Sequence, residues 1–352
     1  MLRALRDVGH EVTVMGPLPS VSYFTLRTLN KAIKKTSGYF LDPSHAWRSA
    51  KEFSRAAERR AKGQRLDWIF APASSSAFVC AEFDCPVIYY TDATFKLLVD
   101  SYPAYSKMLR SSIKAGNAIE RAALQRARYS LVPSRWAAAS ALTDYQTPED
   151  RVGIIPMGAN LVSPPSREQA LNERDDAVFH MLFIGVWWER KGGSIALETL
   201  KELRRRGIPA VLTVCGCNPP EKASDVQTYS FLDKSNPTDT QLLHSLFLRS
   251  HVFILPTRAD ASPMVLSEAA AYGLPCLSTR VGGVPEIVLD GETGNLFPLD
   301  APVSDYADAA QRLWENKDLL RRQRSAARDR YEQYLQWSAW ALTITSNYFK
   351  FK

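Results

Sequence analysis

The stretch Leu255-Pro-Thr-Arg-Ala-Asp-Ala-Ser-Pro-Met-Val-Leu-Ser-Glu-Ala-Ala-Ala-Tyr-Gly-Leu-Pro275 predicts a strand, a loop and a helix, which is one unit of a parallel sheet covered by helices. Ser262 is a good N-cap, and Pro263 suits the first helical turn because the N–H that proline lacks would have no partner there. The N–H groups and the dipole at this helix start, around Pro263 and Met264, favour an anionic phosphate at the carboxyl edge of the sheet.

Two carboxylates border the junction of this loop and helix. Asp260 lies in the loop, and Glu268 follows Met264 by four residues, so that Glu268 and Met264 share one helix face. Carboxylates accept charge-assisted hydrogen bonds from sugar hydroxyls, a common way to hold a ribose or a hexose. Two interpretations stay open: a sugar-binding pocket, or a capping acid at 260 and a solvated helix glutamate at 268.

A second loop, Gly185-Val-Trp-Trp-Glu-Arg-Lys-Gly-Gly193, follows an expected strand over residues 179–184 and opens a helix over residues 194–205. Glycine lets the backbone approach a ligand closely, and Arg190 and Lys191 can neutralise a diphosphate. Basic residues at a turn are often only solvated. Here both loops occupy the same place in successive strand–helix units, which favours a shared site at one sheet edge.

Short β-rich runs alternate with helical patterns along the chain, which predicts an α/β fold with two doubly wound parallel sheets. We expect a first domain over residues 1–160, a linker around 158–165, a second domain over 166–335, and a C-terminal helix over 336–352 that returns to the first domain. The expected strands are residues 12–15, 67–71, 86–90, 129–132, 152–155, 179–184, 211–215, 252–255 and 276–278.

The composition indicates a globular protein with an anionic partner. The chain has 352 residues, of which 45% are hydrophobic, and a formal net charge of +7, which suits a nucleotide diphosphate, a phospholipid surface or nucleic acid. No run approaches the roughly 18 to 20 apolar residues that a membrane span needs. The five cysteines are odd in number and lack metal-type spacing, so we expect a cytoplasmic location.

The motifs together carry a specific resemblance to a known family. Glu189-Arg-Lys-Gly-Gly193, Pro256-Thr-Arg-Ala-Asp260 followed by Glu268-Ala, Gly282-Gly-Val-Pro-Glu-Ile-Val288 and Asp290-Gly-Glu-Thr-Gly294 resemble the retaining glycosyltransferases of family 4, which have the GT-B fold. The resemblance covers nearly the whole chain. It implies two Rossmann-like domains facing a cleft, a nucleotide-sugar donor on the second domain, an acceptor on the first, no cofactor or essential metal, and retention of anomeric configuration.

Carried over by position, the resemblance implies that Lys191 binds the donor diphosphate and Glu268 the donor ribose. Asp260 stands where the family has a glutamate that contacts the sugar, and it is one methylene shorter. The family's arginine after Gly185 is Val186 here, so Arg190 becomes the candidate for the second positive charge. The predicted donor-binding set is Gly185, Arg190, Lys191, Ser262, Pro263, Met264 and Glu268.

The candidate on the acceptor side is Asp92, in Tyr89-Tyr-Thr-Asp-Ala-Thr-Phe95 after an expected strand. The resemblance places a His or Asp that faces the cleft near this position, while a cap of the next helix is an equal alternative. We take Asp92 and Asp260 as the candidate catalytic residues. We name no protein nucleophile, because similar enzymes let the acceptor hydroxyl attack from the face that the leaving group departs.

The expected partners are a nucleotide-sugar donor and a glycan, lipid-linked or small-molecule acceptor. The basic segment over residues 25–65 is typical of helices with one solvated face. The alternative is that this segment docks on the inner face of a membrane. A nucleic-acid partner is not expected, because this segment lacks a regular arrangement of stacking aromatic residues.

Two other functions stay open, a nucleotide-sugar epimerase with the same architecture and a non-catalytic protein that binds nucleotide sugars. The chain opens at Met1 in a helix-like run before residues 12–15, whereas family members place a strand and a glycine-rich loop before that helix. We therefore expect a shortened chain whose first domain lacks its first strand. About 15 to 25 upstream residues should restore the strand, soluble yield and activity.

Overall fold

The computed structural model describes residues 1–175, 177–221, 223–229 and 231–349. The chain divides into two compact units, unit 1 (Met1–Ile155 with Ala341–Lys352) and unit 2 (Pro156–Trp340). Residues 158–165, the expected linker, therefore lie within unit 2, where Ala159 N–H donates to Leu335 O at 2.8 Å.

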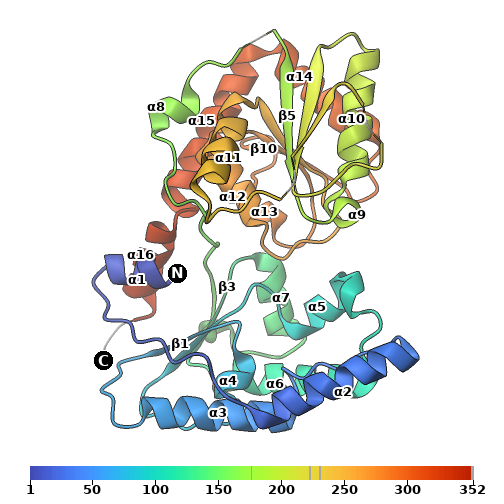
Figure 1. Cartoon of the computed structure of the whole chain (residues 1–352). Helices are drawn as coiled ribbons and strands as arrows, with labels where there is room; N and C mark the ends of the chain where they lie inside the picture. The colour runs from blue at the N-terminus through green and yellow to red at the C-terminus, as the bar shows by residue number, and fades with distance from the viewer. Residues whose placement is uncertain (176, 222, 230, 350–352) are drawn as a thin grey trace. The chain divides into compact units, whose positions relative to one another are not determined.

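Unit 1 is built on a parallel sheet with the order β1-β2-β3-β4 (Figure 1). Its strands are short, and strand β2 is buried along its whole length. The strands are β1 (Ile69–Pro72), β2 (Val87–Tyr90), β3 (Tyr129–Val132) and β4 (Val152–Ile154). The helices are α1 (Leu2–Asp7), α2 (Val21–Ser37), α3 (Trp47–Ala61), α4 (Ser75–Phe78), α5 (Phe95–Ser101), α6 (Arg110–Arg126) and α7 (Arg135–Thr143). Helix α16 (Trp337–Asn347) begins in unit 2 and belongs to unit 1 from Ala341 onward.

The strand expected over residues 12–15 is wrong, because this segment has no regular secondary structure. Its alternating apolar residues fit a strand, but a strand also needs a hydrogen-bonded neighbour. The structure instead ties the segment to helices: the Arg6 guanidinium donates to Val12 O at 3.1 Å, and Arg60 donates to Met15 O. Val14 is 60% exposed, so little apolar burial favours a strand here.

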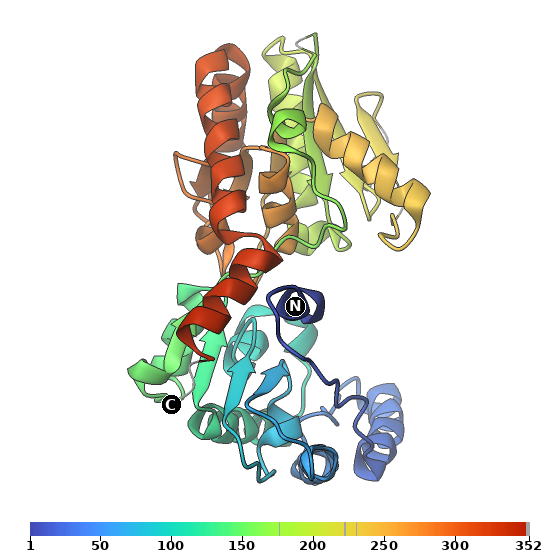
Figure 2. The same cartoon turned by 90° about the vertical axis from the view of Figure 1, so that its left-hand side faces the viewer.

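Unit 2 has a wider parallel sheet with the order β10-β9-β8-β5-β6-β7. Its strands are β5 (Phe179–Ile184), β6 (Ala210–Cys215), β7 (Val226–Tyr229), β8 (Val252–Leu255), β9 (Cys276–Thr279) and β10 (Gly294–Phe297). Its helices are α8 (Arg167–Leu171), α9 (Trp188–Lys191), α10 (Gly193–Arg205), α11 (Pro237–Arg249), α12 (Met264–Ala271), α13 (Val284–Ile287), α14 (Val303–Glu315) and α15 (Lys317–Tyr334). Helix α15, red in Figure 2, packs against α12 and α14.

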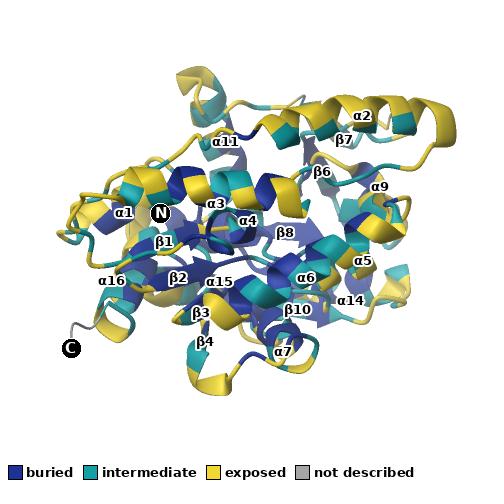
Figure 3. Cartoon of the chain, turned by 90° about the horizontal axis from the view of Figure 1, so that it is seen from below, coloured by how far each residue is buried: buried dark blue, intermediate teal, exposed yellow. Residues whose placement is uncertain are grey.

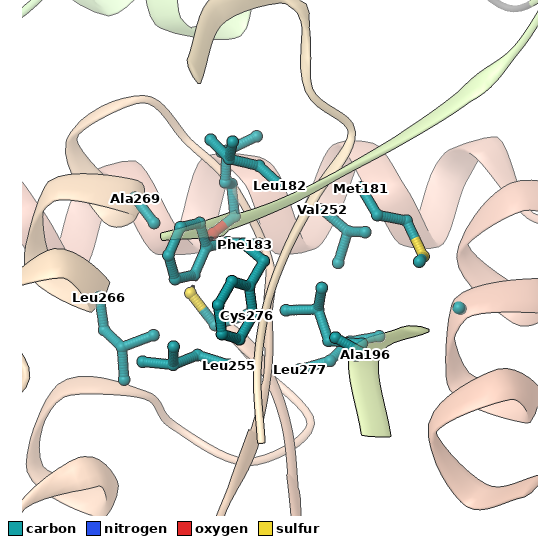
Figure 4. Close-up of a cluster of buried hydrophobic side chains, with 14 of the residues drawn as sticks. Met181, Leu182, Phe183, Ala196, Val252, Leu255, Leu266, Ala269, Cys276 and Leu277 are labelled. Carbon is teal, nitrogen blue, oxygen red and sulfur yellow. Dashed lines mark hydrogen bonds between the residues drawn. The ribbon is translucent and has the colours of Figure 1, made fainter. Parts of the chain in front are cut away.

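The core of unit 2 lies where the central strands meet their covering helices. Met181, Phe183 and Leu255 are fully buried, together with Leu277 and Leu266 of α12 (Figure 4). These side chains fix β5 and β8 side by side, and parallel neighbours end at the same sheet edge. The loops that follow β5 and β8 therefore emerge together.

Candidate functional site

The loops after β5 and β8 are joined at the carboxyl edge of the unit 2 sheet. Arg258 N–H and the Thr257 hydroxyl donate to Arg190 O at 2.8 and 3.2 Å, and the Arg190 guanidinium donates to Ala259 O at 2.8 Å. Gly192, between helices α9 and α10, has φ +77°, and a Cβ there would collide with Pro256 O. Only glycine therefore permits this close approach of the two loops.

The ammonium ion of Lys191 forms an ion pair with the Asp260 carboxylate across these loops. Both side chains are largely buried, at 13% and 11% exposure, which rules out a simple solvated lysine at this turn. The lysine stem crosses directly over Gly185, where an added Cβ would lie 2.9 Å from Lys191 Cγ. The predicted residues Gly185, Lys191 and Asp260 therefore lie together.

Arg190 supplies a second cation beside this pair. Its Nη1 lies 3.9 Å from Asp260 Oδ2, and its guanidinium carbon lies 5.7 Å from the centre of the Trp187 ring. Trp187 and the neighbouring Val186 are 55% and 59% exposed. Val186, at the position where the family has an arginine, therefore contributes no charge. Arg190 instead places a positive charge near the Asp260 carboxylate.

Glu268 is buried on α12 with only 3% of its side chain exposed, so the interpretation as a solvated helix glutamate is wrong. Its carboxylate pairs with the ammonium ion of Lys234 at 2.5 Å. Burial raises the pKa of Glu268, while the charge and hydrogen bond of Lys234 and a hydrogen bond from the Asn160 backbone act to lower it. A buried carboxylate in this setting needs polar partners to stay ionised.

Helix α12 begins one residue later than the sequence predicts. Its N-cap is Pro263 rather than Ser262, and no side chain caps it. A residue before proline avoids the helical region, and Pro263 itself has the non-helical ψ of 84°, so the helix starts at Met264. Leu266 N–H donates to Pro263 O at 2.8 Å, which closes the first turn.

Lys234 is the site residue that sequence reasoning missed. It lies between β7 and α11. The sequence does not predict β7, because its residues Val-Gln-Thr-Tyr do not form an apolar run, and in the structure none of them is fully buried. The Asn-Pro pair at 236–237, which caps and starts α11, is the signal that marks this loop. Strand β7 is parallel to β6, so Lys234 follows β7 in the chain on the side of its carboxyl end.

Asp92 lies in unit 1, in the turn after β2, and is partly buried. The helix that follows is capped by Thr94, whose hydroxyl accepts from Leu97 N–H at 3.4 Å, so Asp92 is not the cap of α5. Glu120 of α6, hydrogen-bonded by the Tyr89 hydroxyl at 3.0 Å, lies within electrostatic reach of Asp92. Burial first, and the Asp92 charge among smaller causes, raises the pKa of Glu120 to about 7.

Within the described ranges, no group of three or more His, Cys, Asp and Glu side chains is arranged to hold a metal ion. All five cysteines are free. No helix in the described part of the chain is long and apolar enough to cross a membrane.

Comparison with known proteins identifies matches over both units. The family model Glycosyltransferase Family 4 matches residues 1–162, and Glycosyl transferases group 1 matches residues 179–316. The chain is 28% identical over 192 residues to the D-inositol 3-phosphate glycosyltransferase of Pseudarthrobacter chlorophenolicus, which covers 51% of this chain and 46% of the relative. The chain spans about half the length of the curated relatives it matches.

Solved structures with two parallel-sheet units of the GT-B type share the fold. Sucrose-phosphate synthase of Thermosynechococcus elongatus superposes with a TM-score of 0.67 at 18% identity, covering 86% of this chain and 78% of that chain. HepE of Anabaena in complex with UDP-glucose gives 0.58 at 14% identity, covering 80% and 78%. At these identities the likeness establishes the fold, and the α/β GT-B class expected from the sequence is confirmed.

Proposed function

This chain belongs to the family 4 glycosyltransferases, and from that premise we propose that it moves a sugar from a nucleotide-activated donor to a hydroxylated acceptor. The observation that carries the proposal is the ion pair of Lys191 with Asp260, which joins the loops after β5 and β8. The buried Glu268 lies on α12, the helix that follows the second of these loops. Relatives from Pseudarthrobacter chlorophenolicus and Corynebacterium diphtheriae are named D-inositol 3-phosphate glycosyltransferases, which favours transfer over epimerisation or binding alone.

The residues divide the donor between them. Lys191, with Arg190 beside it, takes the diphosphate, and Glu268 accepts hydrogen bonds from the ribose hydroxyls. Asp260 contacts the transferred sugar. For this contact its ion pair with Lys191 must open, or the carboxylate must bind Lys191 and the sugar together. Gly185 and the turn at Ser262, Pro263 and Met264 bring backbone close to the ligand.

The chemistry follows from charge. When the glycosidic bond to the diphosphate breaks, negative charge grows on the leaving oxygen, and cations fixed beside it lower the barrier. The acceptor hydroxyl forms the new bond from the face that the diphosphate leaves, so that configuration is retained. We place Asp92 on the acceptor side, where its carboxylate accepts a hydrogen bond from the incoming hydroxyl.

Turnover should survive saturating EDTA, because Lys191 and Arg190 balance the diphosphate charge in place of a metal ion. The measurement is release of nucleoside diphosphate with and without chelator. Loss of activity on chelation, with recovery on adding manganese or magnesium, would contradict metal-independent transfer.

We place the enzyme in a reducing compartment, which its free cysteines support.

We also propose that α2 binds an anionic membrane surface. No residue of this 17-residue helix is buried (Figure 3). Val21 and Phe24 are 78% and 61% exposed, and all of the charged residues in the helix are basic: Arg27, Lys31, Lys34 and Lys35. Exposed apolar and basic residues on one helix suit a bilayer of acidic phospholipids.

Sedimentation with vesicles tests this surface. The chain should bind vesicles containing phosphatidylserine and leave vesicles of phosphatidylcholine alone, and Lys31→Glu with Lys35→Glu should lower the affinity at least tenfold, at about 1 kcal/mol for each charge lost. Arg321→Glu with Arg322→Glu on α15 is the matched control. Equal binding by both pairs of variants would remove α2 from the interface.

The experiment that tests the proposed function is a panel of UDP-, GDP- and ADP-sugars, with UDP-glucose included. A ligand held at about one hundred times its Kd adds about 2.7 kcal/mol to the folded state, which raises the Tm by roughly 5 to 10 °C for a unit of this size. The stabilising donor should then release its nucleoside diphosphate on incubation with acceptors. A panel without any stabilising member would reject the function.

A further inference from the structure

The contact between Lys234 and Glu268 is built into the loop that carries the lysine. The side chain of Asn236 accepts from Thr238 N–H at 2.9 Å and so caps α11. The hydroxyl of Thr240, in the first turn of that helix, donates to Lys234 O at 3.1 Å. These bonds hold the main chain at Lys234 against the start of α11. They therefore fix the position from which the Lys234 side chain contacts Glu268, 34 residues further along the chain.

The two charges of this pair differ in their access to solvent. The Glu268 side chain is 3% exposed and that of Lys234 is 37% exposed. The carboxylate is therefore buried, and its ion-pair partner is partly open to solvent. A ligand hydroxyl that hydrogen-bonds to Glu268 would share the carboxylate with Lys234.

We propose that Lys234 is a positioning residue of the donor site, which keeps the Glu268 carboxylate ionised and oriented to accept hydrogen bonds from both ribose hydroxyls of a nucleoside diphosphate. The proposal rests on the proposed function and adds a residue to it. An ionised carboxylate accepts from two hydroxyls at once, whereas a protonated one must donate through one of its oxygens.

The groups around Glu268 explain why it needs this partner. Burial favours the neutral acid, and Lys234 opposes burial through its charge and its hydrogen bond. Tyr272, whose hydroxyl lies 2.9 Å from His244 Nδ1, also faces Glu268, and burial followed by the Glu268 charge raises the pKa of that phenol. A neutral phenol and an imidazole do not replace an ammonium ion, so loss of Lys234 leaves the carboxylate to take up a proton.

The test compares UDP with 2′-deoxy-UDP, or the matching pair for the base that the chain binds, by titration calorimetry from pH 6 to 9. Lys234→Met should raise the Kd for the ribose form roughly ten- to a hundredfold near pH 7, the size expected for a charged hydrogen-bond partner, and this loss should shrink toward pH 9 as Glu268 ionises. The preference for ribose over deoxyribose should fall in parallel. Lys234→Arg should restore both, and Lys201→Met, which removes an exposed paired lysine of the same unit, should change neither.

A second pair of variants separates positioning from a direct contact with phosphate. Once Glu268→Gln is present, adding Lys234→Met should have no further effect on the Kd, because the lysine acts through the carboxylate; the amide also removes any uncompensated buried charge. A loss in Lys234→Met that is equal at every pH and leaves the ribose preference intact would overturn the proposal. Absence of nucleotide binding by the unmodified chain would overturn the proposed function as well, whereas normal binding by Lys234→Met overturns this inference alone.

Discussion

Replacing Lys191 by alanine is expected to weaken donor binding or turnover roughly ten- to a hundredfold, the loss of one charged hydrogen-bond partner worth about 1.5 to 3 kcal/mol. The ammonium ion is nearly buried and lies at the join of the two loops, where it meets Asp260. A diphosphate bound there loses its closest cation in the variant. Kd and kcat/KM for the donor are the quantities to measure.

The lysine stem also packs over Gly185, so alanine removes packing as well as charge. Lys191→Met keeps most of the stem, and it should lose donor affinity as severely as alanine while keeping more of the stability. Lys201→Met on α10 is the matched control, because that lysine is 42% exposed in its ion pair with Glu198. Unchanged kinetics in both Lys191 variants would remove this residue from the site.

Asp260 also affects the donor affinity that a Lys191 variant would show. Without Lys191, the carboxylate keeps Arg190 at 3.9 Å as a neighbouring cation. Residues in one ion-pair network do not contribute additively. A cycle that combines Lys191→Met with Asp260→Asn therefore measures their coupling, and a large coupling energy is expected if both act on one bound donor.

Glu268→Gln is expected to impair donor use by a similar roughly ten- to a hundredfold. The amide keeps the shape of the side chain but loses the charge that accepts strongly from ribose hydroxyls. Lys234 is left without its carboxylate, but at 37% exposure it can be hydrated, so the fold should survive. Donor Kd and the Tm of the variant are measured together, with Glu202→Gln on α10 as the control.

The stability of the unmodified chain should depend on pH in a defined direction because of Glu268. Burial raises the folded pKa of Glu268 above its ordinary value, so the stability that this group contributes is present at acid pH and declines as the pH rises through the raised pKa. Glu268→Gln cannot ionise and should flatten that part of the profile. Glu120 in unit 1, with a pKa raised to about 7, titrates in both proteins and cancels in the difference. A Tm lowered at every pH, with normal donor affinity, would make Glu268 structural.

Most strands could be predicted from the sequence where short runs are mostly apolar. Residues 252–255 coincide with β8 and are all apolar and buried. Residues 179–184 and 129–132 coincide with β5 and β3, each of which is mostly apolar and mostly buried with one polar residue, His180 or Ser130. Strand β7 escapes such reasoning because two of its four residues face solvent, and β10 contains Gly294 and Asn295, which have low strand preference. Residues 12–15 show the converse error, since a strand pattern without a pairing partner does not form a strand.

The sequence predicts which sheet edge carries the candidate site. Loops after adjacent parallel strands meet at one edge, and this places Lys191 beside Asp260 although they are 69 residues apart. The partner of Glu268 could not be predicted, because Lys234 lies after β7, a strand that the sequence pattern does not indicate, and 34 residues before Glu268. The start of α12 at Met264 depends on the backbone of Pro263, which local capping preferences alone do not determine.

The most direct test of the central claim is a crystal structure of the chain with the nucleoside diphosphate that stabilises it most. We predict that the diphosphate lies within hydrogen-bond distance of Lys191 Nζ, and that the ribose hydroxyls lie within hydrogen-bond distance of the Glu268 carboxylate. A nucleotide bound elsewhere on the chain, with the pairs of Lys191 with Asp260 and Lys234 with Glu268 undisturbed, would contradict the account.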